Sequence, residues 1–148
     1  MDKYYYGYEE FLYDIRTLHQ MIRSYGPDTL LAVARGGLTM GHFLANAMDT
    51  RRLFALNSIH YNGTKKLETM EIFNIPDLSD ARKVLILDDI ADSGETLVAV
   101  LEKLQERYPE VQFKIATLFH KPESLIRPDF TLKEPPAWID FFWEVDPL

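Results

Sequence analysis

The sequence predicts an α/β domain built on a mostly parallel β-sheet that is flanked by helices. Two apolar runs, TLLAVA (29–34) and KVLIL (83–87), are typical of strands that are buried on both faces of a parallel sheet. Each run is followed by a glycine-containing turn and then by apolar residues at helical spacing. This alternation indicates right-handed crossovers, and in such sheets ligands bind beyond the carboxyl ends of the strands.

The helices follow from apolar residues that recur every three or four positions. A first helix is expected to end near Gly26 and Pro27, because glycine can terminate a helix and proline cannot continue one. A second helix is expected over 38–48, directly after the turn RGG. The apolar faces of the first helix and of a third one near residues 97–104 are Phe11, Leu12, Ile15, Leu18 and Ile22, and Leu97, Val100, Leu101 and Leu104.

Two further strands are expected, at 52–59 and at 113–119. Residues 60–80 show polar turn signals and no sustained period, so they are expected to form mostly a flexible loop with one weak strand near 70–73. A loop of this length inside a compact domain is uncommon and often closes over an active site. The tail from residue 122 onward is rich in proline and aromatic residues.

Length and composition restrict the class of protein. A chain of 148 residues is the size of one domain (1–148), and 47% hydrophobic with 26% charged residues is typical of a globular protein. No apolar run approaches the roughly 20 residues that span a bilayer, and no secretory signal begins the chain, so we expect a cytoplasmic protein. The absence of cysteine excludes thiolate chemistry, and a net charge of −7 argues against nucleic acid as a partner.

The segment VLILDDIADSGET (84–96) concentrates carboxylates at the end of a buried strand. At the start of the following helix, the backbone amides near Ser93 can bind an anion such as a phosphate monoester, and Gly94 lets that backbone approach closely. The carboxylates of Asp88 and Asp89 can accept hydrogen bonds from paired hydroxyls or bind a divalent cation. A phosphate at one end and a diol at the other describe a ribose 5-phosphate.

A simpler interpretation of the same segment stays open. Asp92, Ser93 and Glu95 can cap a helix while Asp88 and Asp89 belong to a solvated loop. Receiver domains and Walker B strands also place acidic residues at strand ends. A P-loop enzyme is excluded, because the motif G-x-x-x-x-G-K-[ST] occurs nowhere in the chain.

VLILDDIADSGET resembles the ribose-phosphate-binding signature of the type I phosphoribosyltransferases. AVARGGL (32–38) is similar to the pyrophosphate loop of that family, which often contains a non-proline cis peptide. LFHKPES (118–124) and AWIDFFWE (137–144) are similar to the base-recognition segments of the bacterial xanthine-guanine phosphoribosyltransferases. The resemblance covers most of the chain from Thr29 onward. It implies the type I phosphoribosyltransferase fold, with a flexible active-site loop at about 60–80 and a small base-recognition hood at about 119–148.

The resemblance also implies an activity. Members of the family transfer the 5-phosphoribosyl group from 5-phosphoribosyl 1-pyrophosphate (PRPP) to a base, with Mg²⁺ as cofactor, and release pyrophosphate. A purine salvage enzyme acting on guanine, xanthine or hypoxanthine would produce the nucleoside monophosphate, and a homodimer or homotetramer is expected. Two alternatives remain open, namely a phosphoribosyltransferase for another base and a non-catalytic regulator that senses PRPP or a nucleotide. Neither nucleic acid nor a membrane is expected as a partner.

The implied roles divide the residues into three groups. For PRPP, Arg35 and Gly36 would bind pyrophosphate, and Asp88 and Asp89 would bind the ribose hydroxyls directly or through Mg²⁺, with Asp89 as the metal ligand. For the base, Asp92 would face N7 of the purine, where it could take up a proton. The 5′-phosphate of PRPP would bind at Asp92, Ser93, Gly94, Glu95 and Thr96. On the base, Lys121 would bind O6 and Trp138 would stack on the purine plane, while Ile139 and Asp140 would address the N1 and 2-position edge.

The chain departs from the family pattern in two places. Glu95 stands where a second small residue is usual, and its carboxylate would repel a phosphate unless the side chain points away. The expected loop has His60 and Tyr61 where the family often has a Ser-Tyr pair, and Lys65 and Lys66 are candidates to close over pyrophosphate. We interpret the remaining aromatic residues of the tail, Phe141, Phe142 and Trp143, as packing or subunit-contact residues.

Overall fold

A five-stranded sheet with the order β4-β3-β2-β5-β6 forms the centre of the computed structural model, which describes residues 2–62 and 68–148. Neighbouring strands are parallel except for β4, which pairs antiparallel with β3. This confirms the predicted mostly parallel α/β sheet. The strands are β2 (Thr29–Ala34), β3 (Leu53–Asn62), β4 (Glu68–Phe73), β5 (Lys83–Ala91) and β6 (Gln112–His120).

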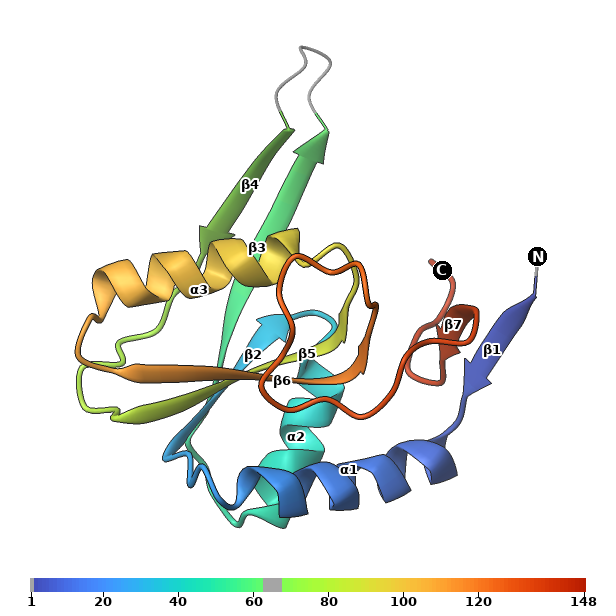
Figure 1. Cartoon of the computed structure of the whole chain (residues 1–148), viewed down its shortest axis with the longest axis horizontal. Coiled ribbons are helices and arrows are strands. Elements are labelled where there is room, and N and C mark those ends of the chain that lie inside the picture. Colours follow the sequence, from blue (N-terminus) through green and yellow to red (C-terminus); the bar gives the residue numbers. More distant parts are fainter. Residues whose placement is uncertain (1, 63–67) are drawn as a thin grey trace.

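Helices cover both faces of this sheet. Helices α1 (Tyr8–Ile22) and α2 (Leu38–Ala47) lie on one face, and α3 (Glu95–Arg107) lies on the other (Figure 1). Strand β5 shows why residues 84–87 are all apolar. Its residues alternate between two buried clusters, with Leu85 on the side of α1 and α2 and Ile86 on the side of α3.

A second, two-stranded sheet joins the two ends of the chain. Strand β1 (Lys3–Tyr6) pairs in parallel with β7 (Trp138–Phe141), so that the amino-terminal strand holds the carboxyl-terminal tail beside the main sheet (Figure 1). Neither strand is predicted from the sequence. The run KYYY is rich in tyrosine, which strands favour, but its partner lies far along the chain and no local pattern reveals it.

Two expected boundaries need correction. Part of the expected loop at 60–80 is a β-hairpin, because β3 continues to Asn62 and β4 begins at Glu68, and residues 63–67 lie outside the described residues. Strand β5 continues past KVLIL to Ala91, because its outer residues still pair with β6, for example Asp88 with Thr117. The two aspartates therefore lie on a strand and not in the turn that follows it.

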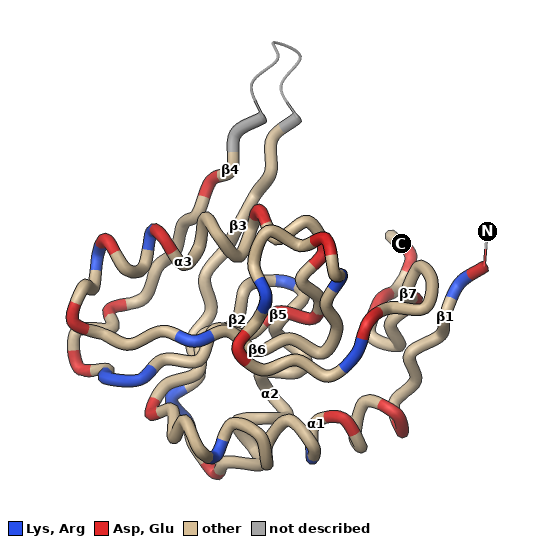
Figure 2. The backbone as a smooth tube through the Cα atoms, in the orientation of Figure 1, with Lys and Arg blue, Asp and Glu red and all other residues tan. Residues whose placement is uncertain are grey.

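Charged residues are spread over most elements, with Asp and Glu outnumbering Lys and Arg by 23 to 16. Figure 2 shows one acidic segment on β5, within the sheet, whereas most of the other charges lie on outer elements. Such an inner acidic segment needs a specific explanation, because carboxylates are seldom buried without a partner. Of the helices in residues 2–62 and 68–148, none combines the length and apolar character that crossing a membrane requires.

Candidate active site

Three neighbouring strands end at the same edge of the sheet and carry the candidate residues. The parallel strands β2, β5 and β6 are followed by the turn at 35–37, the turn at 92–94 and Lys121. Three pockets lie along this edge. We call them the acidic pocket, the turn pocket and the aromatic pocket, after the residues that line them.

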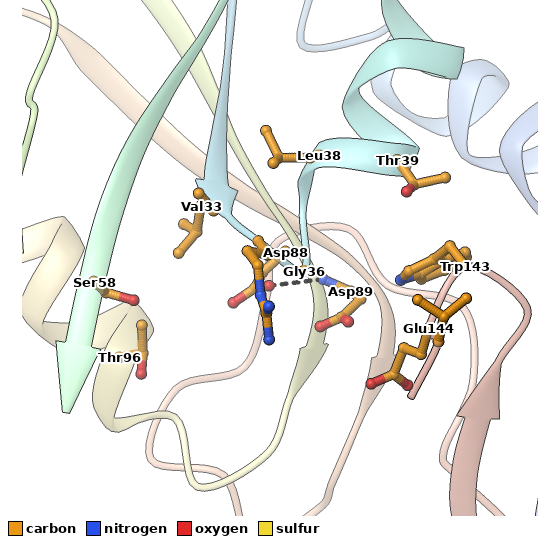
Figure 3. A pocket seen from close by; sticks show the side chains of 13 residues that line it. Val33, Gly36, Leu38, Thr39, Ser58, Asp88, Asp89, Thr96, Trp143 and Glu144 are labelled. Carbon is orange, nitrogen blue, oxygen red and sulfur yellow. Dashed lines mark hydrogen bonds between the residues drawn. The ribbon is translucent and has the colours of Figure 1, made fainter. Parts of the chain in front are cut away.

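The acidic pocket has a volume of about 610 Å³ and lies between the turn after β2, the end of β5 and the carboxyl-terminal tail. Asp88 and Asp89 form one wall, and Asp88 Oδ1 accepts a hydrogen bond from the backbone N–H of Asp89 over 2.9 Å (Figure 3). The full lining is Val33, Ala34, Arg35, Gly36, Leu38, Thr39, Ser58, Asp88, Asp89, Thr96, Trp143, Glu144 and Val145.

The turn after β2 lies directly against the two aspartates. A Cβ atom on Gly36 would come within 2.8 Å of Asp88 Oδ1 and 2.7 Å of Asp89 Oδ1, so a side chain here would displace the carboxylates. The peptide bond between Ala34 and Arg35 is cis, as the family resemblance suggests for this loop. Glycine thus brings the backbone of this turn and the end of β5 to the same wall of the pocket.

Burial changes the ionisation of both aspartates. It raises the pKa of Asp89 to about 6, and the charge of Glu144 acts in the same direction while the hydrogen bond with Asp88 opposes it. Burial, followed by the neighbouring charge of Asp89, raises the pKa of Asp88 well above its usual range. Both groups remain partly accessible from the pocket. A cation placed there would stabilise the two carboxylates in their ionised form.

The donor atoms of this wall fit Mg²⁺, which prefers oxygen ligands and is commonly held by one or two carboxylates together with substrate phosphates. Within the described parts of the chain, no three His, Asp or Glu side chains come together in a cluster that could hold a metal ion. A cation bound by Asp89 would therefore take most of its other ligands from the substrate or from water.

The turn pocket is small, about 70 Å³, and lies where β5 passes into α3. Gly94 has a positive φ of 87°, and a Cβ atom there would come within 2.5 Å of Ser124 Oγ and 2.8 Å of the Leu125 nitrogen. Leu125 N–H donates to the Ser93 carbonyl over 2.8 Å, which fixes the turn against the loop after β6. The lining residues are Asp88, Ile90, Ala91, Asp92, Ser93, Gly94, Thr96 and Leu97.

The aromatic pocket has a volume of about 360 Å³ and is closed on one side by the tail. Lys121 Nζ lies 2.6 Å from Asp92 Oδ1, and this hydrogen bond raises the pKa of Lys121. The ring of Trp138 is not part of the core, because 65% of the residue is exposed. The lining residues are Ile90, Asp92, Lys121, Pro135, Ala137, Trp138, Ile139 and Phe141.

Shared residues show that the three pockets adjoin one another. Asp88 and Thr96 line both the acidic and the turn pocket, whereas Ile90 and Asp92 line both the turn and the aromatic pocket. The turn pocket therefore lies between the other two. One ligand can reach from a carboxylate-lined end, past a helix N-terminus, to an aromatic end that carries a lysine–aspartate pair.

Comparison with known proteins decides the family. Residues 5–148 match the phosphoribosyl transferase domain family. The chain belongs to this family. A xanthine-guanine-hypoxanthine phosphoribosyltransferase from Helicobacter pylori is structurally similar, with a TM-score of 0.91 and 39% identity over 97% of this chain and 95% of that chain.

Two other relatives agree with this assignment. A purine phosphoribosyltransferase from Pyrococcus horikoshii has a TM-score of 0.85 and 33% identity, covering 100% of this chain and 97% of that chain. A xanthine-guanine phosphoribosyltransferase from Ruegeria sp. is 30% identical over 146 residues, which cover 89% of this chain and 80% of that protein. The chain is accordingly a type I phosphoribosyltransferase that resembles the bacterial xanthine-guanine enzymes, a glycosyltransferase of the purine phosphoribosyltransferase class.

The phosphoribosyltransferase fold brings most of the predicted site residues to the three pockets. Two of them, Glu95 and Asp140, have exposed side chains and are not among the lining residues of any of the three. The N–H of Glu95 donates to Ser93 Oγ over 3.2 Å, which is a local turn contact, and the N-cap residue of α3 is Gly94, without a side-chain capping bond. Lys65 and Lys66 lie outside the described residues.

The pockets also contain residues to which the sequence assigns no role in substrate binding. Thr39 and Ser58 line the acidic pocket, as do Trp143, Glu144 and Val145 of the tail. Thr39 could have been found, because it is the second residue of the helix that follows the turn after β2. The tail residues carried no such signal, since their place depends on how β7 pairs with β1.

Proposed function

We propose that this phosphoribosyltransferase transfers the 5-phosphoribosyl group of PRPP to a 6-oxopurine, namely guanine, xanthine or hypoxanthine. The observation that supports this most strongly is that three pockets of different chemistry adjoin one another. Together they offer a place for each group in the reaction, with the acidic pocket for pyrophosphate and ribose hydroxyls, the turn pocket for the 5′-phosphate and the aromatic pocket for the base. The names of the purine-specific relatives support a purine as the base.

In this proposal, PRPP binds across the acidic and turn pockets. Arg35 supplies positive charge and Gly36 supplies close backbone approach for the pyrophosphate. The ribose hydroxyls donate to Asp88 and Asp89, directly or through Mg²⁺ held by Asp89. The 5′-phosphate binds at Ser93–Thr96, where the N-terminus of α3 favours an anion through its free N–H groups and its dipole.

The base binds in the aromatic pocket, where atoms of both its six-membered and its five-membered ring are recognised. Lys121 and Asp92 lie side by side as a donor and an acceptor, and O6 and N7 are neighbouring atoms on one edge of a 6-oxopurine. Lys121 therefore donates to O6, while Asp92 accepts from a protonated N7. Trp138 stacks on the purine plane, and the backbone of Ile139 addresses the N1 edge, with Asp140 beside it.

The transfer step forms a bond between N9 of the base and C1′ of the ribose and breaks the bond between C1′ and the pyrophosphate oxygen. The N7 proton passes to the carboxylate of Asp92, and the electron pair of the broken bond leaves with pyrophosphate. The carboxylates near C1′ tolerate the positive charge that develops on the ribose. When bound, Mg²⁺ would neutralise charge on the departing pyrophosphate.

We further propose that residues 1–148 form one phosphoribosyltransferase domain in which the segment at about 119–148 recognises the base. The parallel pairing of β1 with β7 supports this division, because it places Trp138 and Ile139 at one wall of the aromatic pocket. The remaining wall comes from β5 and from Lys121 after β6.

Pyrophosphate release tests the proposal directly. The protein is incubated with Mg²⁺, PRPP and, separately, guanine, xanthine, hypoxanthine, adenine, uracil and orotate. We expect release with the three 6-oxopurines and little with the other bases. Release only with another base would replace the proposed substrate. PRPP binding by calorimetry without release from any base would favour the non-catalytic regulator.

A further inference from the structure

Trp143 occupies an unusual position for an aromatic residue of the tail, because it is partly buried, packs against the core cluster and also lines the acidic pocket. Its ring stacks on Phe141 with the centroids 4.6 Å apart and an interplanar angle of 20°. The rings of Tyr6, Phe11 and Phe142 contact it at steeper angles, with centroids 6.1, 5.3 and 5.1 Å away. Four rings from the two ends of the chain therefore fix the plane of the indole.

The indole N–H of Trp143 points into the acidic pocket, toward the side that Asp89 lines (Figure 3). Among the residues that the structure describes, none accepts a hydrogen bond from this N–H. Every buried side-chain donor in those residues has a partner, so this unpartnered N–H is not buried. The donor is therefore open to the pocket. Because the ring is held in place and its N–H is open to the pocket, this donor is available to an acceptor on a bound ligand.

The chemistry of the surrounding wall indicates what that ligand offers. Among the described residues that line the pocket are the carboxylates of Asp88, Asp89 and Glu144 and a single cationic side chain, Arg35. An anionic group bound here, even with a cation beside it, needs further hydrogen-bond donors. The indole N–H is a donor only and cannot accept, so it discriminates in favour of an acceptor-rich group such as a diphosphate.

We propose that the indole N–H of Trp143 donates a hydrogen bond to an oxygen of the pyrophosphate group of PRPP and so positions this leaving group. The inference rests on the proposed function, in which the acidic pocket receives the pyrophosphate. It assigns a substrate-positioning role to a residue of the tail that otherwise serves the core. The ring cluster holds the donor in place before the substrate arrives, which lowers the entropic cost of binding.

Trp143→Phe tests this role, because it keeps a ring against Phe141 and removes the N–H. We expect the dissociation constant of Mg²⁺–pyrophosphate, measured by calorimetry, and the KM for PRPP to rise about tenfold, the effect of one lost hydrogen bond to a charged group. The KM for the base should stay unchanged. If Trp143 had a purely structural role, its substitution would also shift β7 and Trp138, and the KM for PRPP and the KM for the base would change equally. That result, or unchanged pyrophosphate binding, would overturn the inference.

A second measurement leaves Trp143 intact. The chain has two tryptophans, so Trp138→Phe leaves Trp143 as the sole indole fluorophore. We expect Mg²⁺–pyrophosphate to shift or quench its emission in the wild-type affinity range, because the ligand would bond to the indole N–H. Emission that is unchanged at saturation, with binding verified by calorimetry, would contradict the inference.

The wild-type protein separates this inference from the proposed function. If it releases no pyrophosphate with any base, the proposed function fails whatever Trp143 does. If it turns over a 6-oxopurine while Trp143→Phe binds pyrophosphate as tightly as the wild type, only the role of Trp143 fails.

Discussion

Asp88 and Asp89 differ from surface aspartates in the pH at which they lose their protons. In the unfolded chain an aspartate ionises near pH 4, whereas burial raises the pKa of Asp89 to about 6 in the folded protein. Between these two values the unfolded chain has already released a proton that the folded chain still holds. The ligand-free fold therefore loses stability as the pH rises through this window, and the loss persists above it.

Asp89→Asn should remove the part of this pH dependence that Asp89 contributes, whereas buried Asp88 keeps its own. We expect the variant without ligands to be more stable than the wild type at pH 7.5, by on the order of 1 kcal/mol after allowing for solvent in the pocket, and nearly equal to it at pH 4. Urea unfolding at several pH values measures this difference. A variant that is less stable than the wild type at pH 7.5 would mean that a partner stabilises the ionised carboxylate of Asp89 more than burial destabilises it.

The same ionisation governs cation and substrate binding. Because Mg²⁺ requires an ionised carboxylate, the affinity for Mg²⁺–PRPP should strengthen as the pH rises from 5 to 7.5, with its midpoint near the raised pKa of about 6 for Asp89. Calorimetric titration at four or five pH values measures the midpoint. In Asp89→Asn, binding should be weaker and should depend less on pH over that range, with the remaining dependence coming from Asp88 and the substrate phosphates. A profile identical to the wild type would exclude Asp89 as the cation ligand.

Lys121 is the residue on which base selectivity is expected to depend. Lys121→Ala should raise the KM for guanine and hypoxanthine about tenfold or more, since a charged hydrogen bond to O6 is lost. Adenine carries an amino group at that position, so its poor rate should change little. Steady-state kinetics with each base measures the ratio. Equal losses on adenine and guanine would contradict the role, and Lys121→Arg, which keeps a donor, should lose less.

At the scale of single elements, the strands and helices of the main sheet were largely predictable. The strand at 29–34 has the predicted bounds, and the three helices follow their apolar spacing. The extent of β5 was not predictable, because DDIA has no apolar pattern and is held as a strand by its pairing with β6. The strands expected at 52–59 and near 70–73 correspond to β3 and β4, but their antiparallel pairing and their extension to Asn62 and Glu68 were not predicted, since polar strands depend on their partner.

The turn after β2 offers a test at this scale. In Gly36→Ala the new Cβ atom would come within 2.8 Å of both carboxylates, so the turn or the aspartates must move. We expect kcat/KM for PRPP to fall up to about 100-fold, as expected when binding groups shift by about an ångström. The stability of the fold should change much less than this activity.

Gly41→Ala is the matched control for this turn. Its Cβ atom would meet the side chain of Leu53 at 3.2 Å, inside α2 and away from the pockets. The small crowding is offset by the better helix propensity of alanine, worth about 1 kcal/mol. Activity should stay near the wild-type level. A similar loss in both variants would mean that α2 and not the turn is the sensitive element.

At the scale of the whole molecule, the carboxyl-terminal tail is joined to the first helix by an ionic cluster. Lys133 Nζ lies 2.9 Å from Glu10 Oε2 and 2.9 Å from Asp14 Oδ2, and Asp14 also accepts from the Tyr6 hydroxyl over 2.6 Å. Burial opposes the charge of Lys133, but the hydrogen bonds to Glu10 and Asp14 raise its pKa overall. This cluster keeps the segment that carries β7 in place against α1.

Lys133→Met should leave the buried carboxylate of Asp14 without its cation. We expect the free energy of unfolding to fall by about 3 kcal/mol, as for a buried ion pair that loses one partner. Asp14→Asn in the same background should recover part of the loss. Urea unfolding measures all three proteins.

Asp80→Ala is the surface counterpart of Lys133→Met. It removes the exposed ion pair with Arg52, whose atoms lie 3.1 Å apart. This variant should cost less than about 1 kcal/mol. If Lys133→Met costs no more than this control, the cluster does not hold the tail.

The sequence by itself determined the mostly parallel sheet, its helices and the three short segments that meet at its carboxyl edge. These features depend on periodicity and turn chemistry within a few neighbouring residues. Only the tertiary structure decided that β1 pairs with β7, that Glu95 is exposed and does not line the turn pocket, and that Trp143 directs its indole N–H into the acidic pocket. Those features depend on which distant segments come into contact, and no local pattern encodes that contact.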